Sequence, residues 1–381
     1  MTDTYVSPWM NDELEALRDT ARRFFTKEAV PRMAAWSEQR FVDRDFWLAA
    51  GEVGLLCPTV PERFGGAGGT ILHQVAITEE QSSIVEKGWG NNVHSGVVTD
   101  YLLKYGTEEQ CDRWLPGMVE GRLIGAIAMT EPGAGSDVRA MSTRARHEGD
   151  HYVIDGNKTF ITNGLTADLV IVAVKVEGAA DPKGITLIVV EAGTEGFRRG
   201  KALRKIGQHA ADTAELFFDN CRVPVEHRIG EEGAGFPALM NQMPQERLLL
   251  GVNAVAQTEK AVRLTLDYVK ERRVFGKPLF DQQNTRFELA ECRTLATAAR
   301  IFLDHCVVAL AGGRLDNATA AMAKWWLSDV QCQVVDRCVQ LWGGYGYMEE
   351  YPIARMYADA RVQKIYGGAN EVMKEIIART L

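Results

Sequence analysis

The spacing of apolar residues changes twice along this chain, and the change limits the folds that are open to it. Over residues 11–121, apolar side chains recur every three or four positions, which is the period of a helix buried on one face. Residues 124–230 carry short β-branched runs instead, and the helical period returns after Gly233. The pattern predicts an α+β multidomain protein with an N-terminal helical domain (1–122), a middle β-barrel-like domain (123–232) and a C-terminal helical bundle (233–381).

The last unit contains two long helical patterns. One covers residues 287–310 and is closed by Gly312-Gly313, and the other covers 322–341 and stops at Gly343-Gly344. Glycine is common directly after a helix, because it adopts the left-handed conformation at no steric cost. In the first unit, the glycine cluster 65–69 lacks the strand and the lysine of a phosphate-binding loop, so it is expected to connect two helices.

The middle unit is predicted from its β-branched runs and its turn residues. The pairs Asp155-Gly156 and Asn163-Gly164 are typical of hairpins and barrel corners. Strands are expected at residues 152–154, 169–176, 185–190 and 214–218.

The composition is that of an ordinary soluble protein. Of 381 residues, 46% are hydrophobic and 25% are charged, and no run is expected to be long enough to cross a bilayer. The formal net charge of −8 and the absence of a basic patch with interleaved aromatic residues argue against nucleic acid as a partner. Residues 1–11 show neither a signal sequence nor an arginine-rich transit segment, which favours the cytoplasm.

The cysteines favour a reducing compartment. There are seven of them, dispersed along the chain and never in a CxxC pair, so they are interpreted as thiols and not as disulfides. No metal site is expected from the cysteines or from the seven histidines.

The loop at residues 129–137, which reads Met-Thr-Glu-Pro-Gly-Ala-Gly-Ser-Asp, follows an apolar run and is rich in small residues. Its glycines leave backbone N–H groups open to a ligand, and Thr130 and Ser136 add hydroxyls that suit a flavin edge or a pyrophosphate. Pro132 prevents the strand from continuing. Taken alone, the loop is also consistent with an ordinary turn.

Five segments, in their order along the chain, resemble the acyl-CoA dehydrogenase family of flavoproteins over essentially the whole length. The resemblance implies the three-domain acyl-CoA dehydrogenase fold and FAD as cofactor. It also implies α,β-dehydrogenation of an acyl-CoA thioester to the trans-2-enoyl-CoA, with hydride passing from the β-carbon to flavin N5. The segments are Ala128–Asp137, Thr159–Gly164, Glu271–Lys277, Gln340–Gly346 and Ile365–Arg379.

The resemblance also implies where the cofactor lies. FAD would sit between the β-domain and the C-terminal bundle, and in similar enzymes a neighbouring subunit completes the site, so a homotetramer built as a dimer of dimers is expected. Arginine suits a diphosphate, because it offers paired donors that stay charged. From the residues alone, the favoured interpretation is a strand core residue for Phe160 and a solvated side chain for Arg272. The implied FAD contacts are Met129, Thr130, Ser136, Phe160 and Thr162, with Arg272, Phe275, Gln283, Gln340, Gly343 and Gly344 from the neighbour and Glu371 as a further contact.

The catalytic base is expected at Glu246. Most members of the family place a glutamate in the C-terminal run, where this chain has Gly367. The long-chain and isovaleryl types carry it on the first long helix of the C-terminal domain, and residues 243–250 resemble the long-chain form. The helical neighbours Leu249 and Leu250 make an apolar face, which favours a raised pKa for this carboxyl. The alternative is a solvated glutamate paired with Lys or Arg on the helix surface.

Further substrate contacts follow from the same resemblance. A backbone N–H at Gly367 would meet the thioester oxygen where enolate charge develops. Ala369 stands where the family commonly has threonine, which removes one hydroxyl contact to the cofactor. The acyl chain length stays open. The residues implied to contact substrate or shape its pocket are Ser136, Arg247, Gly367, Gly368, His94 and Ser95.

Three functional hypotheses stay open. The first is an acyl-CoA dehydrogenase that passes electrons to an electron-transferring flavoprotein. The second keeps the fold but acts on a thioester on a carrier protein, or uses oxygen as an oxidase or monooxygenase. The third is a non-catalytic flavin-binding relative, against which the carboxylate of Glu246 argues.

Overall fold

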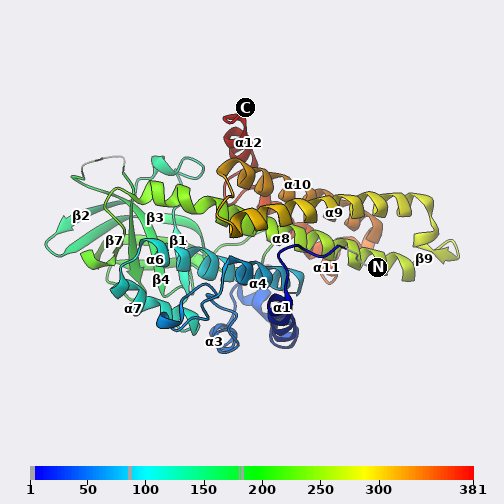
Figure 1. Cartoon of the computed structure of the whole chain (residues 1–381), viewed down its shortest axis with the longest axis horizontal. Helices are drawn as coiled ribbons and strands as arrows, with labels where there is room; N and C mark the ends of the chain where they lie inside the picture. Colours follow the sequence, from blue (N-terminus) through cyan, green and yellow to red (C-terminus); the bar gives the residue numbers. More distant parts are fainter. Residues whose placement is uncertain (1–4, 85–87, 180, 182–183) are drawn as a thin grey trace.

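The computed structural model describes residues 5–84, 88–179, 181 and 184–381, and it confirms the predicted order of helical, β and helical regions. The β-domain lies at one end of the long axis, and the long helices of the C-terminal bundle extend to the other end (Figure 1). The boundaries at residues 122 and 232 stay a prediction.

The N-terminal region consists of short helices around a core of large aromatic side chains. Trp36, Phe46 and Trp47 are almost fully buried, and the ring of Trp89 lies 5.1 Å from that of Phe46. The connection at residues 65–69 lies between two helical segments, as predicted. The helices are α1 (Asp12–Phe24), α2 (Met33–Gln39), α3 (Arg44–Glu52), α4 (Ile71–Ile84), α5 (Asn91–Val93), α6 (Thr99–Tyr105) and α7 (Glu108–Val119), with η1 (Phe25–Ala29), η2 (Val30–Arg32), η3 (Glu62–Phe64) and η4 (His94–Val98).

The middle region is a mixed sheet whose pairing runs in the order β6-β7-β3-β2-β4-β5-β8, with β1 pairing in parallel with β4. The prediction of a hairpin at Asp155-Gly156 is wrong. β3 continues through this pair, and the register shift between Ile154 and Gly156 marks a bulge, which glycine accommodates with a φ of +147°. The elements are β1 (Gly125–Ala128), η5 (Val138–Ala140), β2 (Arg144–Glu148), β3 (His151–Thr162), β4 (Leu169–Val176), β5 (Thr186–Glu191), β6 (Phe197–Ala202), β7 (Thr213–Pro224), η6 (Val225–His227) and β8 (Arg228–Ile229).

The C-terminal region is dominated by three long helices. α8 has 37 residues and therefore runs for about 55 Å at 1.5 Å per residue. α9 is long and apolar enough by composition to cross a membrane, contrary to the expectation that no segment is, but it packs against α8 and α10 in the bundle. The elements are α8 (Gly235–Glu271), β9 (Arg273–Val274), β10 (Lys277–Pro278), η7 (Leu279–Asp281), α9 (Gln283–Ala311), α10 (Asn317–Trp342), η8 (Gly343–Tyr347), α11 (Pro352–Ala360), η9 (Arg361–Lys364) and α12 (Asn370–Ala378).

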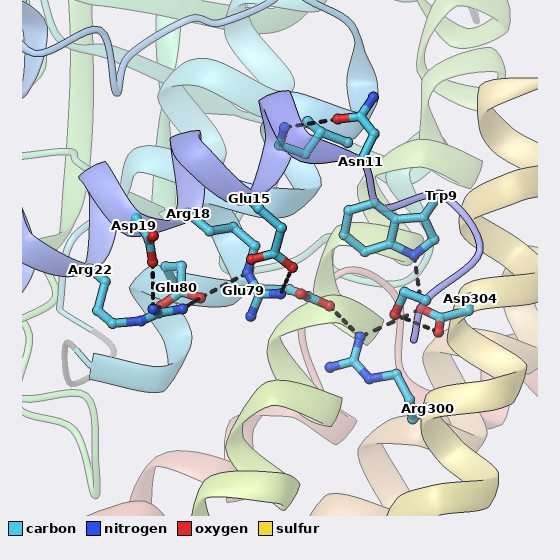
Figure 2. A network of polar contacts seen from close by, with 12 residues as sticks. Trp9, Asn11, Glu15, Arg18, Asp19, Arg22, Glu79, Glu80, Arg300 and Asp304 are labelled. Carbon is cyan, nitrogen blue, oxygen red and sulfur yellow. Dashed lines mark hydrogen bonds and ion pairs between the residues drawn. The ribbon is translucent and has the colours of Figure 1, made fainter. Parts of the chain in front are cut away.

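A buried polar network joins the N-terminal region to the bundle. Arg300 of α9 forms ion pairs with Glu79 of α4, with Glu259 of α8 at 2.8 Å and with Asp304 at 3.5 Å. The indole N–H of Trp9 donates to the same Asp304 carboxylate at 2.9 Å (Figure 2). A buried charge that loses its partner is costly, so this network fixes α4 against α8, the helix that carries the expected base.

Candidate active site

Glu246 lies on α8, on the side that faces α6. The O–H of Tyr101 on α6 donates to Glu246 Oε1 at 3.2 Å. Pro244 precedes the glutamate by two residues and cannot donate its backbone nitrogen to the helix, which loosens the hydrogen-bond ladder at this turn. Glu246 is half-buried, and burial raises its pKa to about 7. The hydrogen bond from Tyr101 and the charge of Arg247 act in the opposite direction. A carboxyl with a pKa close to neutral suits a general base.

The backbone before α6 bends toward this turn of α8. Residues His94–Val98 form a π-helical turn, a feature that is frequent at functional sites. The carbonyl oxygen of Gly96 within this turn accepts from Gln245 Nε2 at 3.3 Å. The π-helical turn therefore contacts α8 one residue before the expected base.

Gly367 faces the same helix one turn further on. Its φ is +63°, and an added Cβ would lie 2.2 Å from Leu250 Cδ1. Leu250 follows Glu246 by four residues, so both side chains lie on one stripe of α8. The side chain of Leu250 thus fills the space where the more common glutamate of the C-terminal run would begin.

The turn at Gly367 and Gly368 presents backbone donors. Neither N–H group donates to an acceptor among the residues that the structure describes. The turn is fixed from behind, because Lys324 Nζ donates to the carbonyl oxygen of Gly368 at 2.6 Å and to Asn370 Oδ1 at 2.8 Å. Lys324 is buried, which lowers the pKa of its ammonium group to about 8. Backbone N–H groups without an acceptor can stabilise a developing oxyanion when a ligand places its oxygen against them.

The loop at residues 129–137 is fixed by a buried ion pair. Glu131 accepts from the Ser142 N–H at 2.6 Å and from Lys158 Nζ at 2.9 Å, and Lys158 also donates to the Met129 carbonyl oxygen at 3.1 Å. The hydrogen bonds from Thr143, Lys158 and Ser142 outweigh burial and hold the pKa of Glu131 at about 2. The charged carboxylate of Glu131 therefore ties the loop to Ser142 and Lys158.

The ligand-facing side of this loop keeps its donors available. In the described part of the chain, the N–H groups of Gly133, Gly135 and Ser136 donate to no acceptor, and the Ser136 side chain is exposed. Thr130 and Thr162 are half-buried, and the Thr130 carbonyl oxygen pairs with the Thr159 N–H at 2.9 Å. Small residues with free backbone donors beside hydroxyls form a donor set that fits a flavin or a phosphate.

Two aromatic residues among the predicted FAD contacts have a positive φ, which is unusual for a bulky side chain. Phe160 has a φ of +60° and is 67% exposed, and Phe275 has a φ of +49° and is 98% exposed. A bulky residue with positive φ is strained, and such strain gathers at binding sites. Phe160 is therefore not the strand core residue that its sequence position also allowed.

A pocket of about 550 Å³ brings together a second group of predicted residues. Trp342 stacks on Tyr268 at 4.0 Å between ring centroids and forms one wall, and the Arg272 guanidinium lies 5.5 Å from the centre of the Tyr345 ring. The lining includes Arg272, Gln340, Gly343 and Gly344. Phe275 and Gln283 lie outside the lining, at the β9–β10 turn and at the first residue of α9.

The two groups of predicted cofactor residues are far apart within one chain. The loop after β1 and strand β3 carry the first group in the β-domain, while β9 lies at the far tip of the bundle (Figure 1). Residues of a single chain therefore do not assemble the complete predicted set. Glu371 lies in the first turn of α12 and is exposed.

Other predicted substrate residues have structural partners. His94 is fully buried, with its Nδ1 accepting from the Gly125 N–H at 3.0 Å, and burial lowers its pKa to about 4. Ser95 is buried beside it and donates to Asn91 Oδ1 at 2.6 Å. Arg247 is buried and donates to Asn317 on α10 and to Met243 Sδ. Their contact with substrate stays a prediction.

The sequence contains one metal-type spacing, His147-Glu148-Gly149-Asp150-His151, which matches HExxH. That motif binds metal when it lies on a helix, because the two histidines then share a face. Here the residues lie at the end of β2, in the turn at Gly149-Asp150 and at the start of β3, with His147 bonded to Glu232 and His151 to Asp150. Among the described residues, no group of three or more His, Cys, Asp or Glu side chains could hold a metal ion.

Sequence reasoning missed Tyr101, Lys324 and the pair of Lys158 with Glu131. Tyr101 looks like any core tyrosine of a helix, and no local pattern links it to a residue 145 positions away. Lys158 offered a signal, since a lysine inside a predicted β-unit near the flavin-type motif needs a buried partner.

Three family models match successive parts of the chain: the acyl-CoA dehydrogenase N-terminal domain over residues 11–122, the middle domain over 126–221 and the C-terminal domain over 233–381. The mitochondrial long-chain specific acyl-CoA dehydrogenase of Sus scrofa is 45% identical over 383 residues, covering 100% of this chain and 89% of that protein. An acyl-CoA dehydrogenase structure from Geobacillus kaustophilus is 45% identical with a TM-score of 0.96, over 98% of this chain and 99% of that one. A FAD complex of an acyl-CoA dehydrogenase from Bacillus anthracis is 29% identical with a TM-score of 0.91, over 99% of this chain and 68% of that one.

Proposed function

Because the chain belongs to the acyl-CoA dehydrogenase family, we propose that it catalyses the FAD-dependent α,β-dehydrogenation of an acyl-CoA thioester. The observation that carries the proposal is the environment of Glu246. Burial raises the pKa of this carboxyl to about 7, and it lies on α8 next to the turn at Gly367. A non-catalytic relative would have no need for a tuned carboxylate at this position.

The chain's own residues supply a base and an oxyanion site. Glu246 in its charged form takes the α-proton, so it becomes neutral while negative charge moves to the thioester oxygen. The free N–H groups of Gly367 and Gly368 donate to that oxygen, and Lys324 holds the turn that carries them. FAD supplies the acceptor for the hydride that leaves the β-carbon.

The cofactor would be held by residues from two subunits. Met129, Thr130, Ser136, Phe160 and Thr162 would contact the flavin half. Arg272 with the backbone of Gly343 and Gly344 would bind the diphosphate half from a neighbouring chain. The distance between the two groups in one chain supports this sharing (Figure 1).

We further propose a homotetramer. Its support is the apolar outer face of α9, where Phe287 is 57% and Ile301 49% exposed. Side chains of this kind are commonly covered in an assembly.

The family resemblance supports an electron-transferring flavoprotein as the acceptor of the electrons. A cytoplasmic location suits the use of buried thiols, such as Cys57 and Cys306, as core residues.

Subunit sharing can be tested by complementation. Arg272→Ala and Glu246→Gln should each inactivate the enzyme when expressed alone. In a mixed dimer, one site combines the intact Glu246 of the first subunit with the intact Arg272 of the second, so co-expression should restore one working site per mixed dimer. A site built within single chains would give no recovery.

The reaction and the substrate can be tested together by anaerobic titration of the purified yellow protein with acyl-CoAs of graded length. We expect loss of flavin absorbance with one length class and formation of the 2-enoyl-CoA. Failure with every CoA thioester but bleaching by carrier-bound acyl groups would favour the carrier substrate. Rapid reoxidation of the reduced enzyme by air would favour an oxidase or monooxygenase.

A further inference from the structure

Tyr101 is a buried residue whose hydroxyl points at the expected base. Its side chain is 0% exposed, and in the described part of the chain its O–H donates to Glu246 Oε1 alone. Burial and the nearby carboxylates raise the pKa of the phenol well above its usual value. The hydroxyl therefore keeps its proton, so Glu246 Oε1 is the acceptor of this bond.

The contacts between α6 and α8 hold this pair in place. Gln245 Nε2 donates to Asp100 Oδ2 at 2.5 Å, and Lys104 Nζ donates to Asp100 at 3.1 Å and to Gln242 Oε1 at 2.8 Å. These bonds join the two helices beside the Tyr101 contact. The direction from which Tyr101 approaches Glu246 is therefore determined by the packing of two helices and not by a flexible loop.

Several charged residues surround Glu246, but Tyr101 is the residue that donates a hydrogen bond directly to its carboxylate. On α6, Asp100 raises and Lys104 lowers the pKa of the glutamate, and on α8 Arg247 lowers it. Lys104 is bonded to Asp100 and Gln242, and Arg247 to Asn317 and Met243. Lys324 of α10 is directed to the Gly368 turn. The cations thus act at a distance, while the tyrosine touches the carboxylate.

We propose that Tyr101 is a positioning residue that holds the Glu246 carboxylate in its charged form and directs Oε2 to the substrate. The inference rests on the function proposed above. Oε1 accepts from Tyr101, which leaves Oε2 for the α-proton. The α-carbon–hydrogen bond breaks, its proton forms the O–H bond at Oε2, and its electron pair passes into the enolate. Tyr101 transfers no proton.

The test is the pH dependence of anaerobic flavin reduction in Tyr101→Phe, with Tyr105→Phe as matched control. Tyr105 lies on the same helix with its ring 6.0 Å from Tyr101, and no bond joins it to Glu246. A hydrogen bond to a charged group is worth enough to shift a pKa by about one unit. We therefore expect the acidic limb of Tyr101→Phe to move up by about one pH unit, with reduction at pH 7 slowed about fivefold, because the charged fraction of Glu246 falls from about one half to about one tenth. Tyr105→Phe should keep both values.

A second readout does not depend on turnover. Infrared difference spectra recorded across pH should show the protonated carboxyl band of Glu246, identified by its loss in Glu246→Gln, with its midpoint raised in Tyr101→Phe. If that variant does not fold, replacement of Tyr101 by 3-fluorotyrosine, a more acidic donor, should move the midpoint downward. An unchanged titration midpoint of Glu246 together with an unchanged acidic limb of flavin reduction in Tyr101→Phe would overturn the inference. An equal shift in Tyr105→Phe would do the same.

The outcomes separate this inference from the proposed function. Normal flavin bleaching in Glu246→Gln would reject the assignment of Glu246 as the base, and with it the proposed mechanism. If Glu246→Gln does not reduce the flavin and Tyr101→Phe shows an unshifted pH dependence, Glu246 stays assigned as the base and only the role of Tyr101 is rejected.

Discussion

Replacement of Gly367 by alanine should slow flavin reduction strongly, although it adds a single methyl group. Two independent terms contribute. The φ of +63° costs a residue with a Cβ about 1–2 kcal/mol. The new Cβ would also lie 2.2 Å from Leu250 Cδ1, and turning the leucine away from its preferred rotamer costs about 0.5–1.5 kcal/mol.

The sum is about 1.5–3.5 kcal/mol of strain at the turn that carries the thioester-oxygen donors. If relief of this strain displaces the turn, reduction by an acyl-CoA should fall by about 10- to 400-fold at 1.36 kcal/mol per factor of ten. Adding Leu250→Ala removes the steric term but not the backbone term. The double variant should therefore regain about two- to tenfold of the lost rate.

Stopped-flow reduction under anaerobic conditions, with FAD content measured for each variant, gives these rates. Gly313→Ala is the matched control, because Gly313 has a φ of +65° with no atom within 4 Å of an added Cβ and lies beyond α9. It should lose stability and keep a normal rate. Wild-type reduction by Gly367→Ala, or no recovery in the double variant, would refute the reasoning.

Three further predictions concern buried charges. Glu131→Gln should lower FAD content, measured as flavin per protein after gel filtration, because it leaves Lys158 buried without its carboxylate, which costs about 3–5 kcal/mol. The double variant Glu131→Gln/Lys158→Met removes both charges and should lose less FAD. Equal losses of FAD in the two variants would contradict this. Arg300→Leu should lower the melting temperature sharply, since Glu79 and Asp304 would lose their cationic partner, and an unchanged melting curve would exclude a stabilising role for the network. The raised pKa of Glu246 costs stability increasingly as pH rises from 4.5 to about 7, so Glu246→Gln should melt higher than the parent protein above pH 7 and no higher below pH 4.5.

The fold was predictable from the sequence because apolar periodicity and turn residues are local signals. The helical patterns at 287–310 and 322–341 lie within α9 (Gln283–Ala311) and α10 (Asn317–Trp342). Asp155-Gly156 misled because the same pair suits a hairpin and a bulge, and only the pairing of β3 with β7 decides between them.

Candidate site residues were predicted only where a motif lies in one segment. The loop at 129–137 and the position of Glu246 came from such motifs. The partner of Glu246 did not, because α6 and α8 meet through packing that no local pattern encodes. The same holds for Leu250 and Gly367, whose complementary shapes become visible only in three dimensions.

The most direct test of the central claim is anaerobic flavin reduction by an acyl-CoA in Glu246→Gln with FAD still bound, beside Glu371→Gln, which removes the other carboxylate of interest. If Glu246 is the base, the first variant should bleach at least about 10²-fold more slowly, in line with the usual contribution of a general base. Glu371→Gln alters a predicted FAD contact, so its rate is compared per bound flavin, and on that basis it should stay near that of the parent enzyme. Near-normal bleaching in Glu246→Gln would contradict the assignment of the base.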